Sequence, residues 1–183
     1  MNKIMLRIRN FGPVKMGFDR DEGYMTIPKV TLFCGPQGSG KSTVAKVLSS
    51  MIWLEKAAYF IGWNSAEDVT LSEKIIRSIL AWHGITSYFH KRTEISYCGE
   101  YLTLQYANEK LTISTRANSS YGKPKIMYVP AERNFLYLLD SNTASKQLPS
   151  PLRTLLDEFK LSQKYLCRKV AYDIPVCYDF GSP

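Results

Sequence analysis

At 183 residues the chain is long enough for one domain with a sizeable hydrophobic core, and its 24 lysines and arginines outnumber its 16 acidic residues to give a formal net charge of +8. That charge suits a polyanionic partner such as DNA, although the basic residues are scattered along the sequence and an ordinary basic surface accounts for them equally well. The chain has no run of about 18 apolar residues, no signal-peptide core and no closely spaced cysteines, so we expect a cytoplasmic protein without membrane contact, disulfide framework or cysteine metal site.

Two strands are predicted in the first part of the chain. Residues 3–9 alternate charged and apolar side chains, as expected of a half-buried strand, and 10–13 (Asn-Phe-Gly-Pro) form a turn. Residues 24–27 form the second strand. They lead through Pro28 into 29–34 (Lys-Val-Thr-Leu-Phe-Cys), whose apolar run predicts a third strand that is buried.

A phosphate-binding motif follows this buried strand. Residues 35–42 read Gly-Pro-Gln-Gly-Ser-Gly-Lys-Ser and match GxxxxGK[ST] at every fixed position. Apolar residues in 42–63 recur at helical spacing, so the loop lies between a strand and a helix, as the motif requires. The alternative is a glycine-rich turn with a chance lysine. The combination of strand, loop and helix argues against that alternative, and we expect the chain to bind a nucleoside triphosphate.

Each part of the motif has a separate physical role. Backbone N–H groups surround the phosphates, and the glycines permit positive φ angles and a close approach. Lys41 supplies a mobile positive charge to the β- and γ-phosphate oxygens, the Ser42 hydroxyl is the expected Mg²⁺ ligand, and the helix N-terminus points at the anion. The predicted nucleotide-binding residues are Gly35, Pro36, Gln37, Gly38, Ser39, Gly40, Lys41, Ser42 and Thr43.

A second helix is predicted over 70–84. Thr70 and Glu73 have the spacing of a capping box, and Gly84 is suited to end the helix. The apolar residues between them, beginning with Leu71, recur on one helix face. We expect that face to belong to the hydrophobic core.

Three short β-rich runs follow at 94–97, 101–106 and 110–115, separated by turn residues. They predict an antiparallel β-subdomain over 94–115. Tyrosines and phenylalanines in and before these runs alternate with lysine and arginine, a pattern compatible with base stacking on a nucleic acid and equally with a hydrophobic core.

A further buried strand is predicted at 125–129, followed by Pro-Ala-Glu-Arg at 130–133. Glu132 is the candidate catalytic residue, because a carboxylate directly after a strand is placed to approach Mg²⁺ or an attacking water. Arg133 is placed to meet a phosphate or a nucleic acid strand. The alternative is that Glu132 caps the next helix and Arg133 pairs with a surface acid, and sequence alone does not separate the two.

The last predicted element is a C-terminal helical segment over 150–171. A polar linker rich in Ser, Asn and Thr precedes it at 141–150. Ser150 is a favourable N-cap residue, and Pro151 suits the first helical position.

Three pieces of the sequence together resemble one family. They are 10–14, the nearly unbroken run 35–46, and 128–133 (Tyr-Val-Pro-Ala-Glu-Arg). The chain resembles the bacterial ABC-like AAA-type ATPases, relatives of the structural-maintenance-of-chromosomes and overcoming-lysogenization-defect ATPases, which act in DNA repair and phage defence. The resemblance implies an α/β P-loop NTPase fold, with a mixed sheet that carries the phosphate loop and an antiparallel β-subdomain alongside. It also implies ATP and Mg²⁺ as cofactors and DNA as a partner.

The chain departs from the family pattern in its second half. Members of the family continue into a signature segment rich in serine and glycine. A Walker B strand follows, ending in paired acids that complete the Mg²⁺ site and supply the general base. No such strand occurs here after Lys41. The resemblance therefore implies that 1–183 is a single but incomplete ATPase domain, an N-terminal lobe whose hydrolysis requires a missing lobe or a second subunit. A homodimer or a partner subunit would supply the signature segment.

Two other function classes remain open. A small nucleoside or nucleotide kinase carries a similar loop on a chain of similar length, but such kinases usually begin with the phosphate-loop strand, and no basic lid segment is found here. In a non-catalytic module, ATP would act as an assembly ligand. A kinase would phosphorylate a small acceptor on its own, whereas a half-ATPase would bind ATP and hydrolyse it only once completed.

Overall fold

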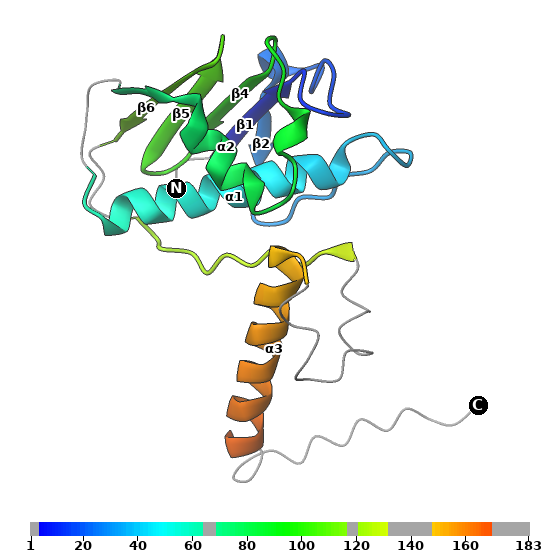
Figure 1. The fold of residues 1–183 in the computed structure, drawn as a ribbon, viewed down its shortest axis with the longest axis vertical. Helices are drawn as coiled ribbons and strands as arrows, with labels where there is room; N and C mark the ends of the chain where they lie inside the picture. The colour runs from blue at the N-terminus through cyan, green and yellow to red at the C-terminus, as the bar shows by residue number, and fades with distance from the viewer. Residues whose placement is uncertain (1–3, 64–68, 117–120, 132–147, 170–183) are drawn as a thin grey trace. The chain divides into compact units, whose positions relative to one another are not determined.

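A computed structural model of the protein describes residues 4–63, 69–116, 121–131 and 148–169, with backbone only for 163–169. The chain divides into two compact units, Met1–Tyr128 and Val129–Pro183. The described residues of the first unit contain the β-sheet, two α-helices, two short 3₁₀ helices (Asp21–Gly23 and Thr86–Tyr88) and the phosphate loop. The second contains the helix α3 (Ser150–Lys169) (Figure 1).

Six strands of the first unit form one sheet in the order β2-β1-β4-β5-β6-β3 (Figure 1). Every neighbouring pair is antiparallel, with Leu6 opposite Tyr97 and Leu104 opposite Ile113 as examples of the register. The predicted antiparallel run over 94–115 is therefore confirmed, but it forms the centre of the sheet and joins the N-terminal strands instead of packing beside them. The strands are β1 (Ile4–Arg9), β2 (Met25–Ile27), β3 (Val69–Ser72), β4 (Glu94–Cys98), β5 (Leu102–Ala107) and β6 (Lys110–Thr115).

The predicted mixed sheet is wrong for the described part of the chain. The segments 29–34 and 125–129, both predicted as buried strands, pair with none of the six strands. Val30, Leu32 and Met127 in these segments are exposed. A continuous apolar run forms a buried strand when other strands pair with it and other elements cover both of its faces. The described residues do not surround either segment in this way.

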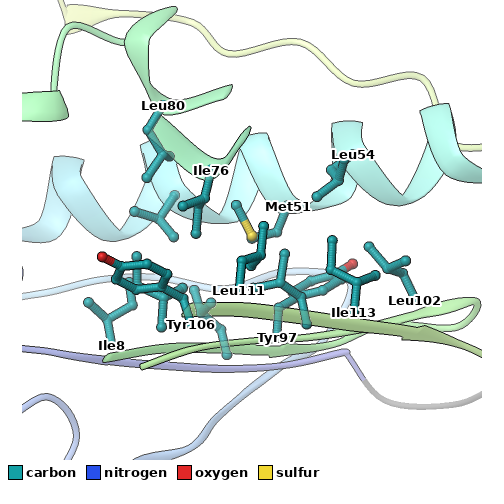
Figure 2. Packing of buried hydrophobic residues seen from close by; sticks show 14 of the residues in the cluster. Ile8, Met51, Leu54, Ile76, Leu80, Tyr97, Leu102, Tyr106, Leu111 and Ile113 are labelled. Carbon is teal, nitrogen blue, oxygen red and sulfur yellow. The ribbon is translucent and has the colours of Figure 1, made fainter. Parts of the chain in front are cut away.

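Two helices cover one face of the sheet (Figure 1). They are α1 (Lys41–Phe60), which begins at the lysine of the phosphate-binding motif, and α2 (Glu73–Ala81). Figure 2 shows apolar side chains of both helices directed toward the strands, where every second residue faces the core. An antiparallel sheet can leave one face in contact with water. Strands that alternate apolar and polar residues therefore bury their apolar side chains under the helices and expose the polar ones on the other face. The core includes Ile8, Met51, Leu54, Ile76, Leu80, Tyr97, Leu102, Tyr106, Leu111 and Ile113.

The second helix is shorter than predicted, because Val69–Ser72 pairs with β6 as strand β3. Thr70 and Leu71 therefore belong to the sheet, and the predicted capping box is wrong. Ser72 is the N-cap residue instead, and its Oγ accepts a hydrogen bond from the Lys74 N–H at 3.3 Å. Pairing of Val69–Ser72 with β6 has moved the N-cap by two residues, from the predicted Thr70 to Ser72.

The helix predicted over 150–171 is observed as α3 over Ser150–Lys169, and 170–171 lie outside the described residues. Ser150 is the first helical residue, so its predicted N-cap position is wrong. Its first turn is closed by the Arg153 N–H, which donates to the Pro149 carbonyl at 3.0 Å. Leu152 and Leu156 are buried. Among the helices of the described ranges, none combines the length and the hydropathy required to cross a membrane.

Candidate nucleotide-binding site

The phosphate loop leads directly into α1, with Gly40 at the N-cap position. Gly38 and Gly40 have φ angles of +79° and +92°, in the left-handed region that strongly favours glycine. The Ser39 N–H donates to the Pro36 carbonyl at 3.3 Å, and the Val44 N–H donates to the Gly40 carbonyl at 2.9 Å. The glycines of the motif are thus required by the backbone path of the loop.

The first turn of α1 offers donors to an anion. Gly40 has no side chain to cap the helix, and no hydrogen bond to a described residue engages the N–H groups of Lys41, Ser42 and Thr43. The positive end of the helix dipole lies at these groups, and the first turn contains no acidic residue. A phosphate placed there would be bound by backbone donors and by the dipole together.

The Lys41 side chain folds back over the loop. Its ammonium donates to the Gly35 carbonyl at 2.8 Å and the Pro36 carbonyl at 2.6 Å, and it lies 3.3 Å from the Ser39 Oγ. Neutral carbonyls are weaker acceptors for an ammonium than charged oxygens are. The charge is therefore held over the loop by partners that a phosphate group outcompetes.

The turn that was predicted at 10–13 supports the loop. Phe11 and Val14 close the turn with reciprocal backbone hydrogen bonds of 2.9 and 3.0 Å. A Cβ atom added to Gly40 would lie only 2.6 Å from Val14 Cγ2, so the side chain of Val14 packs directly against the loop backbone. This contact was not predictable, because Val14 and Gly40 are far apart along the chain and neither residue alone indicates the other.

Asn10 and Phe11 serve the fold. Phe11 is fully buried, and its ring makes edge contacts with Tyr88 and Phe89 at centroid distances of 5.7 and 5.0 Å. The Asn10 carbonyl accepts a hydrogen bond from the buried Thr93 Oγ1 at 2.7 Å. These contacts fix the turn from which Val14 reaches the phosphate loop.

The Ser42 side chain is exposed at the start of α1, whereas the neighbouring Thr43 is buried. Within the described ranges, no three histidine, cysteine, aspartate or glutamate residues gather in a group fit to hold a metal ion. A Mg²⁺ ion at Ser42 would therefore depend on phosphate oxygens and water for its other ligands, as this ion commonly does. Glu132 and Arg133 lie outside the described residues.

His83, after the end of α2, links the two helices of the first unit. Its Nε2 lies 3.3 Å from the Ser49 Oγ, and its carbonyl accepts from the Lys46 Nζ at 3.5 Å. The ring also makes an edge contact with Tyr128 at 4.7 Å. Burial, assisted by the nearby Lys46 charge, lowers the pKa of His83 to about 4. The imidazole is therefore neutral at physiological pH and has a structural role.

The aromatic residues of the sheet are part of the core and are not a surface for stacking bases. Tyr97 and Tyr106 are each 1% exposed. On the face of the sheet away from the helices, Arg7 and Arg9 lie 4.0 and 3.9 Å from the Glu94 carboxylate. Because both arginines lie beside the same carboxylate, they are not evidence for a surface that binds DNA. DNA binding by this protein stays a prediction from its charge and family resemblance.

Comparison of this chain with protein-family models, with curated proteins and with solved structures finds no match. Its relation to the ABC-like ATPases therefore stays a prediction from the sequence pieces that resemble that family. The geometry of the phosphate loop is independent of that relation.

Proposed function

We propose that this protein binds a nucleoside triphosphate, with ATP as the expected nucleotide, together with Mg²⁺ through Gly35–Thr43. The position of the Lys41 ammonium carries the proposal. It lies 2.8 and 2.6 Å from two loop carbonyls, where phosphate oxygens would replace neutral acceptors with charged ones. The N–H groups at the start of α1 and the exposed Ser42 hydroxyl support the same interpretation.

Binding and hydrolysis make different demands on the protein. Phosphoryl transfer requires a positioned water and electrostatic stabilisation of the transferred group, in addition to the contacts that hold the nucleotide. The sequence from Gly23 to Leu54, which includes the whole loop, contains no aspartate or glutamate to orient such a water. The loop on its own therefore supports binding better than turnover.

We propose further that the chain acts as the N-terminal lobe of an ABC-like ATPase. Hydrolysis would require a missing lobe or a partner subunit to supply the signature segment and the general base, since a second copy of 1–183 carries neither. Action on DNA in repair or phage defence is the wider process that the family resemblance suggests.

Turnover by the purified chain with Mg²⁺ and ATP tests this assignment. It would be measured alone, with DNA, and with small nucleoside acceptors, alongside equilibrium binding of ATP. We expect binding without turnover in all three conditions. Transfer of phosphate to a small acceptor would make the protein a kinase and overturn the ATPase proposal, while absence of ATP binding would overturn the nucleotide site itself.

A further inference from the structure

The segment 85–93, which lies between α2 and β4, is bonded to the turn that supports the phosphate loop. The Gly12 N–H donates to the Tyr88 carbonyl at 3.2 Å. The Asn10 side-chain amide donates to the Arg92 carbonyl at 3.1 Å. These hydrogen bonds fix the turn to a segment that is far from it along the chain.

The ring of Tyr88 packs directly against the backbone of this turn. A Cβ atom added to Gly12 would lie only 2.4 Å from Tyr88 Cδ2, and Gly12 has a φ of +53°, in the left-handed region that favours glycine. The same ring is partly buried and meets the Phe11 ring edge-on, with the centroids 5.7 Å apart. Truncation of Tyr88 to alanine would therefore leave a cavity beside the turn.

Val14 connects this turn to the phosphate loop. It follows Gly12 by two residues, and its Cγ2 is the atom that a Cβ added to Gly40 would meet at 2.6 Å. Gly40 is the N-cap residue of α1, where the N–H groups that would hold a phosphate begin. Because close-packed groups transmit displacements, a shift of the turn would reach the phosphate loop through Val14.

We infer that Tyr88 is a positioning residue for the nucleotide site. Its ring holds the turn so that Val14 keeps Gly40, and with it the first turn of α1, in place for a phosphate. This inference rests on the proposed function, because nucleotide affinity is the property that the position of the loop controls. A tyrosine that served only the core would change the stability of the protein and leave the ATP affinity of the folded form unaltered.

Calorimetric titration of ATP with Mg²⁺ into tyrosine variants tests this role, under conditions where circular dichroism shows each variant folded. Tyr88→Ala should bind ATP about fivefold more weakly than wild type. Tyr88→Phe keeps the ring and should restore the wild-type affinity. Tyr24→Ala removes a half-buried tyrosine that lies beside Arg7, and should leave the affinity unchanged. Wild-type affinity in folded Tyr88→Ala would overturn the inference.

A double variant shows whether Tyr88 acts through Val14. Val14→Ala should also weaken ATP binding by about fivefold, and adding Tyr88→Ala should cost little more, because the line of contacts is already broken. Independent effects would multiply to about 25-fold in the double variant. That outcome would overturn the inference.

Hydrogen exchange without nucleotide tests the position of the loop separately from ATP binding. In Tyr88→Ala the amides of 37–44 should exchange faster than in wild type, while those of β5 keep the wild-type rate. Unchanged exchange over 37–44, or equal acceleration in β5, would overturn the inference. Failure of wild type to bind ATP would instead overturn the nucleotide site, and exchange would still show whether Tyr88 holds the loop.

Discussion

Tyr97 on β4 donates a hydrogen bond from its hydroxyl to the carboxylate of Glu55 on α1, at 2.7 Å. Glu55 is only 1% exposed, and its carboxylate also accepts from the backbone N–H groups of Tyr101 at 2.6 Å and Leu102 at 2.9 Å. A buried carboxylate is strongly unfavourable unless donors surround it, and here three donors do. The helix that begins at the phosphate loop is thereby fixed to the turn between β4 and β5.

Disrupting this buried carboxylate should destabilise the fold. Glu55→Gln offers the Tyr101 and Leu102 N–H groups a neutral amide oxygen in place of a charged one and turns the Tyr97 hydroxyl into an acceptor, so we expect the free energy of unfolding to fall by roughly 2 kcal/mol. Tyr97→Phe removes one hydrogen bond to a charged group and should cost about 2 kcal/mol. Urea denaturation measures both, with Tyr24→Phe as a control that keeps its ring beside Arg7. Wild-type stability in Glu55→Gln would contradict this account.

The stability of the protein should also depend on His83 in mildly acidic solution. Burial and then Lys46 lower the pKa of this histidine from 6.5 to about 4. Between these values the unfolded chain binds a proton that the folded chain does not, so the contribution of His83 is complete above pH 6.5 and is lost as the pH falls toward 4. By linkage the full shift corresponds to at most about 3 kcal/mol.

Urea denaturation across this pH range tests the assignment. His83→Gln should flatten the dependence of the unfolding free energy on pH, because the titrating group is gone. The exposed His90 provides the matched control, and His90→Gln should keep the wild-type slope. Equal slopes in wild type and His83→Gln would show that other groups account for the acid sensitivity.

The contact between Val14 and Gly40 predicts unequal effects of two alanine substitutions. In Gly40→Ala the new methyl group lies 2.6 Å from Val14 Cγ2 at a φ of +92°, so both a clash and backbone strain disturb the loop. Gly38→Ala has strain at +79° but open space around the added methyl group. By calorimetry, Gly40→Ala should weaken ATP binding more, by about tenfold or beyond.

A double variant separates the two causes. Adding Val14→Ala to Gly40→Ala removes the clash and leaves the strain, so ATP affinity should recover to about that of Gly38→Ala. No recovery in the double variant would show that the packing of Val14 is unimportant for the loop.

Local sequence patterns predicted the parts of this fold that are determined by residues close together in the sequence. The alternation in 3–9 and 94–115 gave strands, and the spacing after Lys41 gave a helix, because a half-covered sheet and an amphipathic helix follow from periodicity. The pairing of Val69–Ser72 with β6 was not predicted, because β6 lies about forty positions further along the chain. This pairing makes a strand of the residues where the helix was predicted to start.

The candidate site could likewise be predicted only where it depends on residues that are close in sequence. The loop from Gly35 to Thr43 was predictable, because the phosphate-binding motif is local and its glycines are required by backbone geometry. The support from Val14 was not predictable, because it arises from tertiary packing. The prediction of a strand at 29–34 was wrong, because an apolar run indicates burial but does not identify the residues that would pair with it and cover it.

Magnesium should bind this protein with the nucleotide and not alone. No group of three potential acidic, histidine or cysteine ligands exists among the described residues, so Ser42 would share the ion with phosphate oxygens. Ser42→Ala should reduce the gain in ATP affinity that Mg²⁺ gives, while Ser42→Thr retains the hydroxyl and the gain. ATP titrations with Mg²⁺ and with EDTA measure the difference. An unchanged gain in Ser42→Ala would remove Ser42 from the metal site.

Calorimetric titration of Mg²⁺ and ATP into wild type, Lys41→Ala and Lys110→Ala would show whether the ammonium of Lys41 binds the nucleotide. Lys110 is an exposed lysine on β6, so its variant removes the same charge away from the loop. We expect ATP binding in wild type and Lys110→Ala, and an affinity at least about tenfold lower in Lys41→Ala, with the fold intact by circular dichroism. Equal affinity in Lys41→Ala and wild type would contradict the assignment of Gly35–Thr43 as a nucleotide site.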